Sequence, residues 1–217
     1  MTVTAAAGFE AAGIAAGIKR TGALDLALIV NRGPRDAAAA VFTSNRAKAN
    51  PIIWSQQVVL DGAVRAIVLN SGGANCFTGH EGFQVTHRTA EAVASALDIG
   101  AGDVLVCSTG LIGEQLDGEV LEEGVVSAVA RLTTDGGDNA ARAIMTTDSV
   151  PKTAVRTGEG WTIGGMAKGA GMLAPGLATM LVVITTDADL PASDLDTALR
   201  EATRVSFDRL DSDGCMS

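Results

Sequence analysis

GGMAKGAGMLAPGLAT, the sequence of residues 164–179, separates two apolar segments and does most to decide the fold of this chain. Before it, the apolar residues of Trp161–Ala167 predict a strand that leads into a glycine-rich turn. After it, the β-branched run Thr179–Thr186 (TMLVVITT) predicts a second, buried strand. The turn is therefore expected to deliver Ala178 and Thr179 to the start of a buried strand.

The same stretch contains near-matches to two nucleotide-binding motifs, and both fail on context. Residues 169–174 (GAGMLA) match the dinucleotide fingerprint GxGxxA, but that fingerprint must open a helix, and Pro175 and Gly176 end any helix within a few residues. A P-loop reads GxxxxGK[ST], whereas Lys168 precedes rather than follows the corresponding Gly. We therefore expect no nucleotide site here.

The rest of the chain alternates between strand and helix patterns. Apolar runs bounded by Gly, Pro, Asn and Asp predict strands over Leu24–Val30, Ala37–Thr43, Pro51–Val59, Ala66–Asn70 and Asp103–Ser108. Helices are expected over Glu81–Leu97, Asp117–Leu132, Asp138–Met145 and Pro191–Phe207. The result is a mixed α/β chain in which strands outnumber helices, and 217 residues suffice for one domain or a large part of one.

Composition argues against several functional classes. Hydrophobic residues make up 47% of the chain, which excludes intrinsic disorder. The formal net charge of −9 argues against general nucleic-acid binding, which needs a basic surface. No run of about 18 uncharged apolar residues predicts a transmembrane helix. The N-terminal segment, interrupted by Glu10, lacks the features of a secretory signal. These features favour a cytoplasmic protein.

Cysteine and histidine are too sparse to predict a metal centre. Cys76, Cys107 and Cys215 are widely spaced and form no CxxC motif, so we expect neither a disulfide framework nor a zinc knuckle. The only histidines, His80 and His87, lack HExxH spacing. Acid–base chemistry in such a chain must fall to another group, such as an N-terminal amine.

Ala178 and Thr179 allow two interpretations. In the ordinary one, which spacing alone favours, Thr179 simply begins a strand. In the functional one, a tight turn strains the peptide bond before Thr179, and the Thr179 hydroxyl attacks the carbonyl of Ala178. An N-to-O acyl shift followed by hydrolysis would then release Thr179 as a new N-terminus, with its own α-amine as a base beside its hydroxyl.

Three further groups of polar residues each have an ordinary and a functional interpretation. Residues 108–110 (STG) follow a predicted strand and are either a turn or an oxyanion hole, with the Thr109 hydroxyl and the Gly110 N–H as donors. Lys168, an isolated cation in a neutral loop, is either a solvated surface charge or a ligand for a substrate carboxylate. Residues 146–148 (TTD) either end a helix or line the same pocket with hydroxyls.

Five motifs, taken together and in order, resemble the ornithine acetyltransferase family, the self-cleaving glutamate N-acetyltransferases of arginine biosynthesis. They are NSGGAN (70–75), CSTGLIGE (107–114), AIMTTD (143–148), GGMAKGAGMLAP (164–175) and LATML (177–181). The opening segment GFEAAGIAAGIKRTGALDLALIV (8–30) is also similar to that of the family. The set spans most of the chain, and its specificity comes from the combination.

The resemblance implies an activity and a maturation step. Members of the family cut themselves between the Ala and Thr of the LATML motif, here Ala178 and Thr179. The mature α/β heterodimers pair into a heterotetramer. Thr179 would then be the nucleophile of a ping-pong reaction that moves an acetyl group from N-acetylornithine to glutamate through an acetyl-threonine ester. Neither a metal nor an organic cofactor is implied.

The resemblance also assigns a fold and further site residues. Thr109 and Gly110 would form the oxyanion hole. Lys168 and one of Thr146 and Thr147 would contact the substrate, together with the nucleophile. The implied fold is a four-layer α/β/β/α sandwich, similar to N-terminal-nucleophile hydrolases but with different connectivity.

The family pattern divides the chain into residues 1–178 as an α chain and 179–217 as the start of a β chain. Because the family continues well beyond the positions of 211–217, we expect the rest of the β chain, with further substrate-binding residues, to lie outside this sequence. One departure is GANCFTG (73–79), which places Phe77 where the family usually has Cys. We interpret Phe77 as a packing residue.

Two other functions remain open from the sequence. One is a related self-cleaving aminopeptidase or hydrolase, although those enzymes typically carry a Ser nucleophile rather than a Thr in the position of Thr179. The other is a non-catalytic binding module. The sequence also leaves open whether acetyl-CoA is a second acetyl donor, which would make the enzyme an amino-acid N-acetyltransferase as well.

Overall fold

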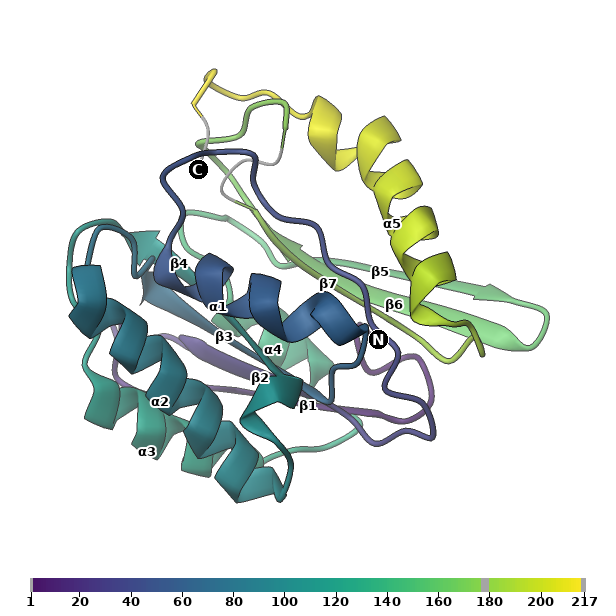
Figure 1. The fold of residues 1–217 in the computed structure, drawn as a ribbon, viewed down its shortest axis with the longest axis horizontal. Helices are drawn as coiled ribbons and strands as arrows, with labels where there is room; N and C mark the ends of the chain where they lie inside the picture. Colours follow the sequence, from purple (N-terminus) through teal and green to yellow (C-terminus); the bar gives the residue numbers. More distant parts are fainter. Residues whose placement is uncertain (1, 177–179, 216–217) are drawn as a thin grey trace.

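The computed structural model describes residues 2–176 and 180–215, over which the chain forms two β-sheets with helices around them (Figure 1). The first sheet has the order β1-β2-β3-β4, with strands Phe9–Ile14, Leu26–Asn31, Ala66–Gly73 and Val104–Leu111. The second has the order β5-β6-β7, with strands Lys152–Gly158, Trp161–Lys168 and Leu181–Thr186. Only β3 and β4 pair in parallel; the other neighbours are antiparallel.

Helices α2 (Gly79–Leu97) and α3 (Gly118–Val129) cover the outer face of the first sheet. Helix α2 presents Val85 and Val93 to the core at helical spacing, and both are almost fully buried. Helix α3 begins after Asp117, whose carboxylate accepts hydrogen bonds from two backbone N–H groups of the first turn, at 3.0 and 3.3 Å. These features explain why the sequence predicted both helices correctly.

A second apolar core fills the space between the two sheets. Ile29 and Leu69 of the first sheet share this cluster with Met166 and Val183 of the second, and all four are at most 3% exposed. Helix α4 (Gly137–Ala143) packs into the same layer against β1 and β2. The two sheets are therefore held face to face by side chains and not by backbone pairing.

Helix α1 (Asn50–Val58) covers the free edge of β4, where the sequence had predicted a strand over residues 51–59. The Trp54 indole donates to the carbonyl of Val104 at 3.0 Å. The Ser55 hydroxyl donates to the carbonyl of Val106 at 2.8 Å and accepts from its N–H at 3.0 Å. The apolar composition suggested a strand, but these tertiary bonds and a Pro in the first turn favour a helix.

Helix α5 (Ala192–Val205) lies on the far side of the second sheet, as Figure 1 shows in yellow. The order of layers is thus α2 and α3, first sheet, second sheet and α5, which confirms the four-layer prediction. Short 3-10 turns occur at Val59–Asp61, Ala101–Asp103 and Phe207–Arg209. Among the described residues, no helix is long and apolar enough to cross a lipid bilayer.

Four other differences from the sequence prediction concern strands. Strand β1 and strand β5 were not predicted, and all of the β5 residues are exposed. The strand expected over residues 37–43 is wrong, because that segment forms only one isolated bridge, between Ala37 and Ala63. Strand β6 extends one residue beyond the predicted Ala167, so Lys168 belongs to the sheet and not to the loop.

Candidate functional site

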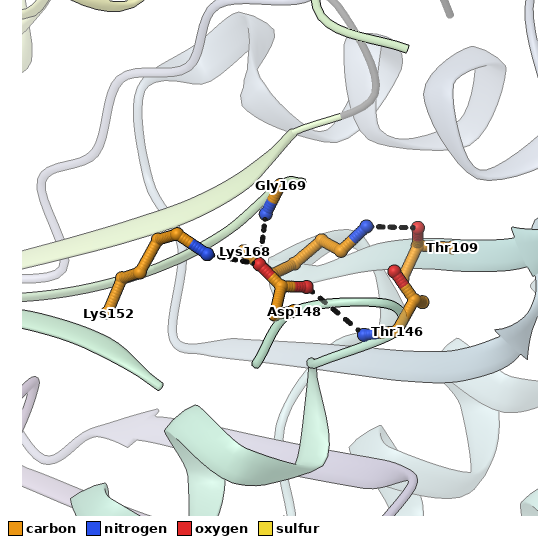
Figure 2. A network of polar contacts seen from close by, with 6 residues as sticks. All are labelled: Thr109, Thr146, Asp148, Lys152, Lys168 and Gly169. Carbon is orange, nitrogen blue, oxygen red and sulfur yellow. Dashed lines mark hydrogen bonds and ion pairs between the residues drawn. The ribbon is translucent and has the colours of Figure 1, made fainter. Parts of the chain in front are cut away.

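Two residues from separate sequence motifs meet between the sheets. Lys168 is the last residue of β6, the central strand of the second sheet, and Thr109 lies on β4, the edge strand of the first. Lys168 Nζ donates a hydrogen bond to Thr109 Oγ1 at 3.2 Å (Figure 2). The two residues are only 3% and 2% exposed. Lys168 is therefore not the solvated surface cation of the ordinary interpretation.

Gly110 lies where β3 and β4 approach each other closely. The sequence predicted that Thr109 and Gly110 follow the strand, but β4 continues to Leu111 because its parallel pairing with β3 extends through a bulge at Gly72 and Gly73. Gly110 has φ +127°, and a Cβ on it would lie 2.5 Å from the carbonyl carbon of Gly72. Only glycine fits at this position.

Ser108 has a defined partner beside Thr109. Its hydroxyl donates to Asn70 Oδ1 at 2.5 Å, and Asn70 Nδ2 donates to the carbonyl of Gly73 at 3.0 Å. The hydrogen bond between Ser108 and Asn70 thus connects β4 to β3 beside the bulge. It therefore supports the backbone around Thr109 and Gly110.

A buried carboxylate belongs to the same network. Asp148 accepts hydrogen bonds from the N–H of Thr146 at 3.2 Å and of Gly169 at 2.8 Å, and it forms an ion pair with Lys152 (Figure 2). Burial acts to raise the pKa of Asp148, but the Lys152 hydrogen bond and the two backbone donors outweigh it, so the pKa lies below its usual value. The segment after α4 is thereby held against the turn that follows Lys168.

Thr146 and Thr147 differ in their surroundings. Thr146 is half-buried and lines an open cleft of about 480 Å³, whereas Thr147 is exposed. The other residues that line the cleft are Lys19, Thr21, Ala23, Leu24, Arg142, Met145 and Pro151. Of the two threonines, only Thr146 lines this cleft.

Lys19 and Asp25 join the site without having been identified from the sequence. Lys19 Nζ donates to the carbonyls of Leu24 and Met145, both at 2.8 Å. Asp25 is fully buried and accepts from the backbone N–H of Lys19 at 2.8 Å and of Ala16 at 2.6 Å. These contacts fix the residue before Thr146. Nothing in GIKRTG (17–22) indicates which of its two adjacent cations turns inward.

The contacts of the site involve three lysines and two carboxylates, Lys19, Lys152, Lys168, Asp25 and Asp148, and Arg142 also lines the cleft. Positive groups therefore outnumber negative ones. Burial lowers the pKa of Lys168; Asp148 acts to raise it, and Lys152 and Lys19 lower it further. Burial also lowers the pKa of Lys19, against the opposing effects of Asp25 and Asp148. The excess of positive charge suits a ligand that carries a carboxylate.

The predicted cleavage site, Ala178–Thr179, lies outside the described residues. The nearest described strand residue after it is Leu181, which pairs with Lys168 across β6 and β7. Within the described part of the chain, no group of three or more His, Cys, Asp or Glu side chains is arranged to hold a metal ion.

The structure also tests what the sequence predicted for Phe77 and for the cysteines. Phe77 is 75% exposed, with φ +60°, so the packing interpretation is wrong for the described part of the chain. The described cysteines are all free thiols. Burial raises the pKa of Cys107, on β4 between Val106 and Ser108, to about 12, which makes it a poor nucleophile.

With this geometry established, comparison with known proteins decides the family. The chain matches the ArgJ family over residues 10–217. It belongs to the ArgJ family. The arginine biosynthesis bifunctional protein ArgJ of Streptomyces coelicolor is 66% identical over 217 residues, which cover 100% of this chain and 57% of that protein. The ArgJ protein of Mycobacterium tuberculosis is 58% identical over 223 aligned residues, covering 99% of this chain and 55% of that protein. The chain therefore spans little more than half the length of these ArgJ relatives.

Solved structures of ArgJ proteins have the same fold. Ornithine acetyltransferase from Mycobacterium tuberculosis, complexed with ornithine, superposes with a TM-score of 0.79 at 58% identity, covering 80% of this chain and 94% of that one. The ArgJ protein of Bacillus halodurans gives a TM-score of 0.66 at 30% identity, covering 88% of this chain and 93% of that one. The mixed α/β sandwich is thus the fold of the ArgJ family.

Proposed function

We propose that this chain carries the acyl-transfer site of a cytoplasmic enzyme that moves the acetyl group of N-acetylornithine to glutamate. Membership of the ArgJ family supports this proposal, as does the ornithine complex of the Mycobacterium tuberculosis neighbour. Because its relatives are called bifunctional, we extend the proposal to acetyl-CoA as a second acetyl donor. The acetyl group would travel as a threonine ester, which needs no cofactor.

The observation that carries the proposal is the hydrogen bond from Lys168 to Thr109. An ammonium group has three donors and no acceptor, so Lys168 must be the donor in this contact. The Thr109 hydroxyl then keeps its own proton to donate elsewhere, and the positive charge beside it makes that proton a stronger donor. A polarised, buried hydroxyl is what stabilisation of an oxyanion requires.

Lys168 also has donors left over for a ligand. Its described hydrogen bond uses one of three N–H groups. In the proposed reaction the other two bind the α-carboxylate that N-acetylornithine and glutamate share. The half-buried Thr146, at the cleft of about 480 Å³, is the proposed hydroxyl contact to the same substrates.

The proposed maturation step supplies the nucleophile. The Thr179 hydroxyl attacks the carbonyl of Ala178, and the peptide bond becomes an ester as its C–N bond breaks and frees the α-amine of Thr179. Water then hydrolyses the ester, which releases the Ala178 carboxylate and restores the Thr179 hydroxyl. Residues 1–178 become the α chain, and residue 179 begins the β chain. We propose that two such α/β heterodimers form a heterotetramer.

The proposed transfer then runs in two half-reactions. The Thr179 α-amine takes the proton of the Thr179 hydroxyl as its oxygen attacks the acetyl carbonyl, and the oxyanion forms against Thr109 and Gly110. The same proton passes to the departing amine of ornithine, leaving an acetyl-threonine ester. The amine of glutamate attacks this ester, and N-acetylglutamate leaves as the hydroxyl is restored.

The test uses the enzyme expressed from its complete gene. Mass spectrometry should show two pieces, with the smaller one beginning at Thr179, and Thr179→Ala should leave one uncut chain because no hydroxyl remains to accept the acyl group. Incubation with N-acetylornithine and glutamate should yield N-acetylglutamate and ornithine in equal amounts. Release of acetate without N-acetylglutamate would favour a hydrolase, and an uncut, inactive wild type would favour a binding module.

A further inference from the structure

Lys168 is a buried cation without a direct ionic partner among the described residues. Its ammonium contacts the Thr109 hydroxyl, while the carboxylate of Asp148 is paired with Lys152. Lysine is almost never this deeply buried unless its charge is compensated, because removing an ammonium from water is costly. Among the described residues, the negative charge that acts on Lys168 belongs to a group that forms no hydrogen bond with it.

Asp148 is the carboxylate that acts on Lys168 across the site. The Asp148 side chain is fully buried, and it accepts from three donors on three segments: Thr146 after α4, Lys152 at the start of β5 and Gly169 after β6. Figure 2 shows Lys168 running past this carboxylate toward Thr109. The Asp148 carboxylate thus connects the segment that carries Thr146 with the turn that follows Lys168. Both Thr146 and Lys168 are proposed to contact the substrate.

Resting on the proposed function, we propose that Asp148 is a positioning residue of the acyl-transfer site: it fixes the Thr146 segment against Gly169 and supplies the countercharge for the Lys168 ammonium. In this proposal it does not touch the substrates: its fully buried carboxylate is held by three donors of the protein itself. Its effect reaches the substrate through Lys168 and Thr146.

The charged groups that face Lys168 make this role testable, because each of them shifts the pKa of Lys168 in a known direction. Asp148 after α4 acts to raise the pKa of Lys168, whereas Lys152 on β5 and Lys19 after β1 act to lower it. Asp148→Asn should therefore lower the pKa of Lys168, and Lys152→Met should raise it. If the Asp148–Lys152 pair were only a structural clamp, breaking it from either side would disturb the site in the same direction.

The decisive measurement does not depend on catalysis. The complete enzyme is labelled with carbon-13 at lysine Cε, and the Lys168 signal, identified by its absence in Lys168→Met, is titrated by NMR. We expect its titration to move to lower pH in Asp148→Asn and to higher pH in Lys152→Met. Shifts in the same direction, or no shift in Asp148→Asn, would overturn the proposal even if acetyl transfer is confirmed.

Kinetics give a second readout. Asp148→Asn should raise the KM for glutamate about 10-fold or more, since the charge-assisted contact through Lys168 weakens, and the loss should grow toward alkaline pH as Lys168 loses its proton. Lys152→Met leaves the Asp148 carboxylate on its two backbone donors, and its KM should not rise. A tenfold rise in the KM of Lys152→Met would contradict the proposal. This test remains available even if Asp148→Asn does not fold. If the wild type transfers no acetyl group, the proposed function fails, and NMR still decides the role of Asp148.

Asp187 offers a matched control in the same second sheet. Its carboxylate also accepts two backbone N–H groups from separate segments, from Ala7 at 2.9 Å and from Thr162 at 2.6 Å. Thr162 lies near the opposite end of β6 from Lys168. Asp187→Asn should therefore leave the titration of Lys168 and the KM unchanged. A shift equal to that of Asp148→Asn would show a general loosening of the sheet and would overturn the specific role.

Discussion

The layer between the two sheets is apolar at one end and charged at the other, and β6 passes from one to the other within two residues. Met166 and Lys168 share a face of β6, because side chains alternate along a strand. Met166 is 1% exposed inside the apolar cluster, and Lys168 is 3% exposed against Thr109. On β4, Cys107 packs against the same cluster and Thr109 follows it on the same face.

The comparison shows that equal burial has opposite effects on the free energy of folding: it is favourable at the apolar end and unfavourable at the charged end. A buried side chain such as Met166 contributes about 1.5–3 kcal/mol to folding by leaving water. The Lys168 ammonium loses its hydration on burial, and the lowered pKa of Lys168 records that cost. A charged group kept in such a place, with a perturbed pKa and a buried hydroxyl as its partner, is characteristic of a functional site.

Thr109→Ala at the charged end should have the largest effect on activity. The acetyl carbonyl gains negative charge only as it is attacked, so a donor aimed at it acts mainly on the transition state. We expect kcat to fall about 10²–10³-fold, or about 2.7–4 kcal/mol, with little change in KM. Steady-state kinetics on protein shown by mass to be fully cleaved would measure this.

Ser108→Ala is the control for that substitution. It removes a hydroxyl one residue away, whose partner is Asn70 and not Lys168. We expect a loss of a net hydrogen bond, about 0.5–1.5 kcal/mol of stability, and a small change in kcat. Equal losses of kcat in the two variants would mean that Thr109 only supports the strand.

Lys168→Met should separate binding from stability. Removing a charge-assisted contact costs about 1.5–3 kcal/mol, so KM for both N-acetylornithine and glutamate should rise roughly 10- to 150-fold. The free energy of unfolding should stay the same or increase, because a buried charge is replaced by an apolar side chain of similar length. Thermal unfolding beside kinetics tests both parts; an unchanged KM would contradict the substrate role.

The pH dependence of that stability difference follows from the lowered pKa of Lys168. Folding penalises the charged form, so the penalty on the wild type is complete below the folded-state pKa. It disappears as pH rises from that pKa toward the ordinary value of 10.5, where the unfolded chain also loses the proton. The advantage of Lys168→Met should therefore shrink at alkaline pH, and denaturant unfolding across that range would show a constant difference if Lys168 were unperturbed.

Met166→Leu should have a smaller effect at the apolar end. The two side chains have similar volumes, and such exchanges usually cost less than about 1.5 kcal/mol. We expect a slightly lower free energy of unfolding and an unchanged KM, because Met166 contacts the cluster between the sheets and has no polar partner at the site. A large rise in KM would show that the two ends of the layer are not independent.

The elements that the sequence predicted well are those whose own pattern determines them. Helix α2 repeats apolar residues at helical spacing, and β7 is a β-branched run. The prediction that this strand is buried was only partly right, because Val183 and Thr185 are buried whereas Ile184 is exposed. Strand β5 has no buried residue, so it offers no alternating apolar pattern to detect. Helix α1 was mistaken for a strand because its bonds to β4 through Trp54 and Ser55 are invisible in the local sequence.

The candidate site shows the same division. Thr109, Gly110, Lys168 and Thr179 were assigned through their motifs and their resemblance to a family, which also assigned one of Thr146 and Thr147 without deciding between them. The contact between Lys168 and Thr109 spans 59 positions of sequence, and only the packing of the two sheets brings it about. Asp148 was read as a neighbour of two hydroxyls, and its bond to the N–H of Gly169 depends on the turn after β6. Sequence motifs can identify individual functional side chains, but interactions between charges on distant segments become visible only in the folded structure.

Cys107 probes the boundary between the two ends with the least disturbance of the enzyme. It lies on β4 beside the apolar cluster, two positions before Thr109, and burial raises its pKa to about 12. At pH 8 such a thiol is about a thousand times less ionised than one at the ordinary value of 9.0. Iodoacetamide should therefore leave Cys107 unmodified in the folded enzyme and alkylate it in urea, as peptide mass spectrometry would show, with activity retained after treatment of the folded form. Rapid alkylation of folded protein would mean that the layer opens beside Thr109, and the polar end would then be a mobile, hydrated surface in which neither a buried Lys168 nor an oriented Thr109 hydroxyl could persist.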